Sequence, residues 1–392
     1  MRFSRLYQKP EKSILLLGPR GIGKSTFIRD EVKPALTIDL LKSVNARALS
    51  KNPSELEDMT AHLKPKQTVF IDEIQKIPEL LDEVHRLIEE KNLTFILTGS
   101  SARRLKKNGV NLLGGRALQR RMFPLSMKEL GSYKKVTELL TCGQLPTAVN
   151  LEDMPSVNDY LFSYVEAYLK EEVLQEGLVR NLTDFGKFIE MAGQYHGQIL
   201  NFENIAREVG KSGDTIKSWF QILEDTLVGS YLEAYPLNIF PRESKHPKFY
   251  FFDNGVARAS EGLRNLELMP EKRGFYLELV ILNELKIYRE ITGADFRIFY
   301  YNVNSIGDID FIIETKRKSL SSASQFMTLE IKHTKKWNSD FQKMSLNIRA
   351  KVPLRLQRML AIYLGDTRLT KNEIDIFPLN SFIKALWDGE LV

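Results

Sequence analysis

One short segment constrains the fold of this chain most: it follows the apolar run Ile14–Leu17 and fits the pattern G-x4-G-K-[ST]. Its glycines let backbone N–H groups wrap a phosphate, and the helix expected after it adds a partial positive charge. Lys24 can reach the β- and γ-phosphates of a nucleotide, and the Ser25 hydroxyl can ligate Mg²⁺. The sequence therefore predicts an ATP and Mg²⁺ site built from Gly18, Pro19, Arg20, Gly21, Ile22, Gly23, Lys24, Ser25 and Thr26.

A second motif stands where such a site needs it. The apolar segment Val69-Phe-Ile ends in two carboxylates, Asp72 and Glu73. Asp72 is expected to hold the Mg²⁺ shell and Glu73 to polarise the attacking water as a general base. The next apolar segment leads to Ser100, a polar residue placed to sense the γ-phosphate. Together these elements predict nucleotide binding and hydrolysis.

The order of apolar and helical segments predicts an α/β protein with three parts. Residues 1–135 alternate buried-strand patterns (13–18, 36–41, 68–73 and 94–100) with helices, which indicates a P-loop parallel sheet covered on both faces. Residues 136–270 read as a helical and winged-helix segment, with apolar residues at helical spacing in 161–179 and 184–195. Residues 271–392 read as a mixed α/β domain with a helix over 274–290 and strands over 297–303, 308–314 and 327–333. The polar stretch 316–325 is expected to connect the last two strands.

The middle part contains a helix–turn–helix pattern. Gly210 and Gly213 can supply the turn, and the second helix carries an apolar face made of Ile216, Trp219, Phe220 and Leu223. Polar residues at the start of that helix suit a recognition helix for DNA, and the segment 231–240 suggests a wing. A winged helix can equally pack as a lid or bind a protein, so both interpretations stay open.

The last part contains carboxylates at positions that would allow them to share a divalent metal ion. Glu278 lies on the predicted helix, Asp310 begins a strand, and Glu330 and Lys332 lie on one face of the next strand. If the two strands are neighbours, the carboxylates make a hard oxygen site for Mg²⁺ or Mn²⁺. Lys332 would then orient the attacking water or stabilise charge on a phosphate. A sheet edge with surface ion pairs is the alternative.

Charge and composition indicate which classes of binding partner this chain favours. Residues 1–130 hold 24 Lys and Arg against 15 Asp and Glu, and residues 315–358 hold 11 against 2, so two regions favour polyanions. The second region supplies basic side chains near the carboxylates: Lys335, Lys336, Lys343, Arg349, Lys351, Arg355 and Arg358. No window approaches the roughly 18 apolar residues of a membrane span, the first residues show no secretory signal, and Cys142 has no disulfide partner. A cytoplasmic protein without a membrane partner is expected.

The motifs resemble a known family. LLGPRGIGKST, FIDEIQKIPELLDEV, FILTGSSARRL, LLGGRALQRRMFPLSMKEL and CGQLPTAV are similar to prokaryotic AAA+ superfamily ATPases with a C-terminal DUF4143 domain, and the similarity spans nearly the whole chain. The resemblance implies a catalytic arginine, with Arg116 as first candidate and Arg103, Arg104, Arg120 and Arg121 as competitors. Whether that arginine acts within its own subunit or on a neighbour in a homo-oligomer stays open.

The carboxylate pattern E…D…E-x-K in turn resembles the PD-(D/E)xK nuclease superfamily, with Ile309 in place of the usual proline. The leading hypothesis is therefore an ATP-hydrolysing protein that acts on DNA, with a nuclease-like domain capable of metal-dependent cleavage. The alternative is a nucleotide-gated switch that binds a protein or DNA partner and never cleaves.

Overall fold

The computed structural model describes residues 2–101, 115–131, 135–169, 181–263, 268–304, 306–319 and 321–392. Its N-terminal part contains β1 (Ile14–Leu17), α1 (Lys24–Phe27), η1 (Ile28–Val32), β2 (Leu36–Asp39), α2 (Ser43–Lys51), α3 (Glu55–Thr60), β3 (Thr68–Asp72), η2 (Ile74–Lys76), α4 (Leu80–Lys91), β4 (Thr94–Gly99), β5 (Leu118–Arg121) and α6 (Met127–Leu130). The strands form a parallel sheet in the order β2-β3-β4-β1-β5. This confirms the predicted P-loop ATPase type of sheet and the four predicted strands. The fifth strand, β5, was not predicted, because all four of its residues are exposed and most are polar.

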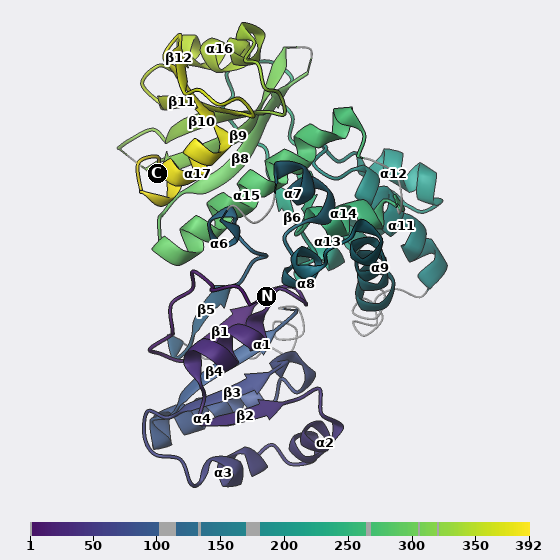
Figure 1. Cartoon of the computed structure of the whole chain (residues 1–392), viewed down its shortest axis with the longest axis vertical. Helices are drawn as coiled ribbons and strands as arrows, with labels where there is room; N and C mark the ends of the chain where they lie inside the picture. The colour runs from purple at the N-terminus through teal and green to yellow at the C-terminus, as the bar shows by residue number, and fades with distance from the viewer. Residues whose placement is uncertain are drawn as a thin grey trace.

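The middle part is mainly helical (Figure 1). It contains α7 (Val136–Cys142), α8 (Pro146–Asn150), α9 (Met154–Ser163), η4 (Tyr164–Leu169), α11 (Leu182–Gln194), α12 (Phe202–Val209), α13 (Gly213–Asp225), β6 (Gly229–Leu232), β7 (Lys248–Phe251) and α14 (Asn254–Ser260). The helix–turn–helix is present as α12 and α13, and the predicted apolar face of α13 is buried. Gly210 ends α12 with φ 73°, a value that favours glycine, whereas Gly213 is already helical.

The segment 231–240, which was expected to form a wing, contacts two different sheets. Its first two residues, Tyr231 and Leu232, end β6, which pairs antiparallel with β7. The chain beyond β6 then runs along the C-terminal sheet, where the Tyr235 amide donates to the Tyr300 carbonyl at 2.8 Å. The Leu237 amide then donates to the Tyr235 carbonyl at 3.0 Å and not to the sheet, so the parallel pairing ends there. The winged-helix interpretation therefore stays a prediction.

The C-terminal part is mixed α/β, as predicted. It contains η5 (Pro270–Lys272), α15 (Arg273–Thr292), β8 (Arg297–Val303), β9 (Gly307–Lys316), β10 (Gln325–Lys332), η6 (Ser339–Gln342), α16 (Lys343–Lys351), β11 (Leu356–Tyr363), β12 (Leu369–Lys371), β13 (Ile374–Pro378) and α17 (Leu379–Trp387). The sheet order is β12-β13-β11-β10-β9-β8, and the polar segment after Lys316 connects β9 to β10 as expected.

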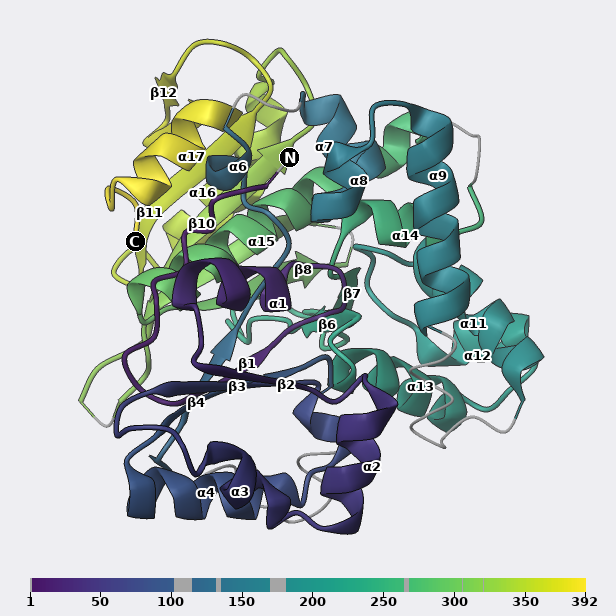
Figure 2. The same ribbon diagram turned by 60° about the horizontal axis from the view of Figure 1, so that its bottom comes forward.

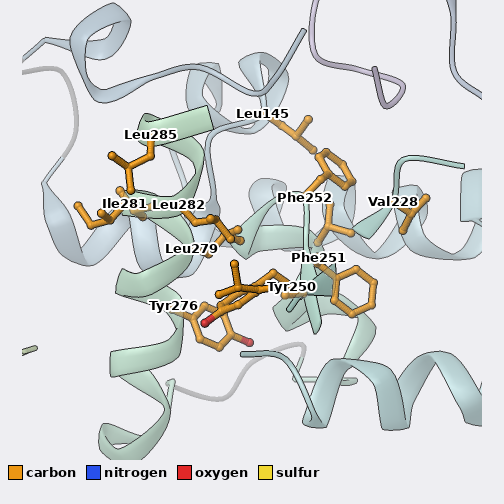
Figure 3. Close-up of a cluster of buried hydrophobic side chains, with 14 of the residues drawn as sticks. Leu145, Val228, Tyr250, Phe251, Phe252, Tyr276, Leu279, Ile281, Leu282 and Leu285 are labelled. Carbon is orange, nitrogen blue, oxygen red and sulfur yellow. The ribbon is translucent and has the colours of Figure 1, made fainter. Parts of the chain in front are cut away.

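Helix α15 belongs to a hydrophobic cluster that contains residues of all three parts. It lies between the N-terminal and C-terminal sheets (Figure 2), and its residues 276–285 are all buried, including the polar Glu278, Asn283 and Glu284. Leu279 and Leu282 of α15 belong to the same buried cluster as Phe252, which follows β7, and Leu145, the residue before α8 (Figure 3). The three parts are therefore in contact through packed side chains. Within the described residues, no helix has both the length and the apolar character needed to cross a bilayer.

Candidate functional site

The phosphate loop connects the buried strand β1 to helix α1 at the carboxyl edge of the sheet. Gly21 and Gly23 have φ values of 77° and 93°, which residues with a Cβ rarely adopt. Lys24 folds back into the loop, where its Nζ donates to the Gly18 carbonyl at 2.7 Å and to the Pro19 carbonyl at 2.9 Å. The loop is thus shaped for a phosphate, with the ammonium group held beside it.

The second motif meets the loop at the same edge. The Gly18 amide donates to the Gly99 carbonyl at 3.1 Å, which fixes the loop beside the end of β4. Asp72 ends β3, and its Oδ1 accepts a hydrogen bond from Thr98 Oγ1 at 2.5 Å, while Arg29 lies 3.7 Å from Oδ2. The Asp72 carboxylate is therefore oriented before any metal binds. Sequence reasoning missed Thr98 and Arg29, although Thr98 lies two residues before the predicted Ser100.

Glu73 is held in an unusual conformation. Its φ is 62°, in the left-handed region, which costs a residue with a side chain about 1 kcal/mol. Its carboxylate accepts hydrogen bonds from Gln75 and, at 3.2 Å, from Ser100 Oγ. Gln75 also donates to Ser100 Oγ at 2.9 Å. Glu73 and Ser100 are thus brought together as predicted, and Gln75, which no motif marks, connects them.

A cavity of 210 Å³ opens beside the loop and is lined by the N-terminal segment and by α8. Its walls include Phe3, Ile22, Thr26 and Pro146. Arg5 forms part of the same wall, with its guanidinium donating to the Ile22 carbonyl at 2.6 Å and to Glu129 at 2.9 Å. Nothing in the sequence distinguishes Phe3 or Arg5 as site residues, because their partners lie far along the chain.

The middle part contacts the phosphate loop directly. Tyr164 OH donates to the Arg20 carbonyl at 3.0 Å, and a Cβ added at Gly21 would lie 3.2 Å from Tyr160 OH. Both tyrosines belong to the continuous helix formed by α9 and η4. A change in the loop on nucleotide binding would therefore reach this helix through side-chain contacts.

The candidate arginines occupy different places. Arg116 lies just before β5, and Leu118 pairs with Ile14 at the amino edge of the sheet, whereas the phosphate loop leaves from the opposite edge. Arg116 also forms an ion pair with Glu89 of α4 at 2.5 Å. The structure therefore separates Arg116 from the loop of its own chain. Arg120 and Arg121 are exposed on β5, and Arg103 and Arg104 lie outside the described residues.

The C-terminal motif residues come together on neighbouring strands. Leu329 of β10 pairs with Phe311 of β9, so one more step of this antiparallel register sets Glu330 opposite Asp310. Lys332 Nζ lies 2.9 Å from Glu330 Oε2 and 3.4 Å from Asp310 Oδ2. The Ile331 amide also donates to Asp310 Oδ2 at 2.6 Å. The predicted cluster of Asp310, Glu330 and Lys332 is present, with both carboxylates buried and the lysine side chain 26% exposed.

Glu278 has other partners. Its carboxylate accepts hydrogen bonds from Lys248 Nζ at 3.2 Å and from Tyr250 OH, both on β7. Across the parts of the chain that the structure describes, no group of three or more His, Cys, Asp or Glu side chains is arranged to hold a metal ion. A metal shared by Glu278, Asp310 and Glu330 therefore stays a prediction. Sequence reasoning missed Lys248 and Tyr250, which lie in a different part of the chain.

The protonation of this cluster follows from burial and from the two ammonium groups. Burial raises the pKa of Glu330 well above its usual range, and the Asp310 carboxylate adds to that rise. Burial also opposes ionisation of Asp310, but Lys332 and Lys248 outweigh it and lower the Asp310 pKa. Burial raises the pKa of Glu278 to about 7. Asp310 and Glu330 can therefore lie side by side, because Glu330 favours its protonated form and the two lysines offset the charge of Asp310.

Three family models match successive segments of this chain. Residues 10–131 match the family model "AAA domain", residues 133–267 match "Domain of unknown function (DUF8612)", and residues 273–382 match "Domain of unknown function (DUF4143)". An uncharacterized protein of Mycobacterium tuberculosis is 26% identical over 95% of this chain and 79% of its own length. An uncharacterized protein of Methanocaldococcus jannaschii is 21% identical over 79% of this chain and 74% of its own length.

Solved structures give more distant similarity. The Aeropyrum pernix ORC1 protein in complex with DNA aligns with 65% of this chain and 87% of its own, at 12% identity and a TM-score of 0.29. The Bacillus subtilis DNA clamp loader delta protein aligns with 70% of this chain and 95% of its own, at 12% identity and a TM-score of 0.25. TM-scores this low do not establish a common overall fold. The family matches confirm the expected resemblance at both ends: the chain begins with a segment that matches an AAA domain and continues into one that matches DUF4143.

Proposed function

We propose that this protein binds and hydrolyses ATP with Mg²⁺ and uses the nucleotide cycle to act on DNA. One observation carries the proposal: the phosphate loop, the Asp72–Glu73 pair and Ser100 meet at one edge of a parallel sheet that matches an AAA domain. Each residue type supplies what phosphoryl transfer to water needs.

The chemistry divides among five residues. Lys24 would leave its loop carbonyls for the β- and γ-phosphates, and Ser25 with the pre-oriented Asp72 would hold Mg²⁺. The metal would neutralise charge on the phosphates. Glu73 would take a proton from the attacking water, with Ser100 fixing its carboxylate. The cost of holding Glu73 in a left-handed conformation is consistent with a catalytic position.

The cavity beside the loop suits the nucleoside part of ATP. Phe3 and Pro146, which line the cavity together with Thr26, offer apolar surface for a base. Since Pro146 begins α8, a bound base would connect the ATPase part to the middle part. Together with the Tyr164 contact to the phosphate loop, this gives nucleotide binding two routes into the helical region.

The C-terminal cluster supports a second, finer proposal, that this domain acts on nucleic acid with a divalent metal. Asp310 and Glu330 face each other beside Lys332, which is the chemistry expected of the nuclease-like motif. The basic segment 315–358 would contribute phosphate contacts. Against cleavage, Lys332 already neutralises the pair, and Glu278 is bound by Lys248 and Tyr250. That observation favours the alternative proposal, a nucleotide-gated switch that engages its partner and does not cut.

ATP turnover with and without single-stranded, duplex and branched DNA tests the first proposal. Glu73→Gln should keep MgATP binding and lose turnover, whereas Lys24→Ala should lose binding. Glu79→Gln is the matched control, because Glu79 is a neighbouring exposed glutamate outside the site. Turnover by Glu73→Gln at the parental rate would refute the assigned base, and DNA-independent turnover combined with no DNA binding would refute action on DNA.

A further inference from the structure

A cleft of 280 Å³ separates the ATPase sheet from helix α15. One wall contains the start of the phosphate loop, Gly18 and Pro19, with the end of β5. The other contains the β6–β7 region and α15, the helix that Figure 2 shows between the two large sheets. The lining therefore combines parts of the molecule that are far apart in sequence.

Three cationic side chains line this cleft: Arg121 of β5 and Lys286 and Arg289 of α15. Lys286 Nζ donates to Ser230 Oγ at 2.8 Å, and Arg289 donates to the Phe296 carbonyl at 3.1 Å. Within the described ranges, none of the three forms an ion pair with a carboxylate. Their positive charge is thus available to an anion from outside.

The electrostatics of the cleft favour binding of an anion. Burial, together with like-charge repulsion from Arg121 and Arg289, lowers the pKa of Lys286 to about 7. Glu224 opposes this effect, and Glu290 lines the same cleft without pairing to the cations. A bound anion would relieve the repulsion and keep Lys286 charged.

The phosphate loop supplies no hydrogen-bond donor on this side. The Gly18 amide is already bonded to Gly99, and Pro19 has no N–H. The carbonyls of both residues are bonded to Lys24. An anion in the cleft would therefore be held by the three cations and not by the loop that we assign to ATP.

We propose that the cleft lined by Arg121, Lys286 and Arg289 is a second phosphate-binding site, occupied by a backbone phosphate of DNA or by a free phosphate. Arginine and lysine are the side chains that proteins use for both. The DNA source rests on the proposed function, whereas the free-phosphate source does not. Because the cleft lies beside Gly18, an anion bound there would influence the phosphate loop.

Anisotropy of fluorescein-labelled single-stranded and duplex DNA between 50 and 200 mM NaCl tests the DNA source. Lys286→Met and Arg121→Met should each reduce the slope of log K against log[salt] by about 0.9 for duplex or about 0.7 for single strands, one phosphate contact each. Lys51→Met, an exposed lysine of α2 with the same charge loss, should leave the slope unchanged. Arg121 is exposed, so its variant tests the site even if Lys286→Met fails to fold.

Calorimetry with pyrophosphate tests the free-phosphate source in a Lys24→Ala background, where the phosphate loop is disabled. Pyrophosphate binding there that Arg121→Met abolishes would support the cleft even if the protein binds no DNA. If the protein binds DNA but Arg121→Met and Lys286→Met behave like Lys51→Met in both measurements, the cleft proposal is wrong and action on DNA survives. Absence of both DNA and pyrophosphate binding would overturn the cleft proposal.

Discussion

The buried ion pair between Arg5 and Glu129 should hold the phosphate loop in place. Arg5 Nε lies 2.9 Å from Glu129 Oε1, and the two side chains are 5% and 0% exposed. The same guanidinium donates to the Ile22 carbonyl within the loop. Glu129 also caps α6, because its Oε2 accepts from the Ser126 amide at 2.9 Å. Glu129→Gln keeps the volume, removes the charge and replaces one acceptor by a donor.

The expected loss is large because Arg5 would remain buried without its counter-charge. Breaking a buried pair by removing one partner typically costs about 3–5 kcal/mol, which corresponds to at least a ~100-fold loss of hydrogen-exchange protection. We expect this loss in β1, β5 and α6, measured by hydrogen–deuterium exchange with mass spectrometry. Nucleotide affinity should fall as well, since the Ile22 carbonyl loses its fixed donor.

The matched control is Glu90→Gln, which breaks a pair with Arg86 whose side chains are 56% and 33% exposed. An exposed pair contributes about 0.2–1 kcal/mol, so protection should fall at most about fivefold. The double variant Arg5→Met with Glu129→Gln should recover part of the loss, because no unpaired charge stays buried. Equal protection in Glu129→Gln and Glu90→Gln would refute the reasoning.

Three further predictions follow from particular residues. If Arg116 completes the site of a neighbouring subunit, specific ATPase activity should rise with protein concentration, and mixing Arg116→Ala with Lys24→Ala chains should restore turnover; a strict monomer with a concentration-independent rate would exclude this. Asp310→Ala should abolish any Mn²⁺-dependent DNA cleavage in a nicking assay and leave basal ATPase unchanged, so cleavage by that variant would remove the assigned site. Burial raises the pKa of Glu284 to about 7. The contribution of protonated Glu284 to the free energy of unfolding is therefore fully present below about pH 4.5 and is lost as the pH rises through 7. Thermal stability should therefore fall by up to roughly 3 kcal/mol more between pH 5 and 8 in the parent than in Glu284→Gln, and parallel pH profiles would contradict it.

Some features could be predicted from the sequence because they depend on neighbouring residues. The phosphate loop needs glycines and a lysine within a few positions between a strand and a helix, and the structure forms it there. The pairing of Asp310 with Glu330 followed from strand alternation, once the two strands were assumed to be neighbours. The apolar face of α13 followed from its helical period.

Other features were decided only by the tertiary structure, because they join residues that no local pattern connects. Arg5 meets Glu129 across 124 positions, and β5 forms from exposed residues because β1 offers it an edge for backbone pairing. The Glu278 carboxylate accepts hydrogen bonds from Lys248 and Tyr250, which lie on a strand of the middle part. These two donors already occupy the carboxylate that the sequence assigned to a metal. Local patterns report which chemistry a segment can support, whereas burial and long-range packing decide which charges finally face one another.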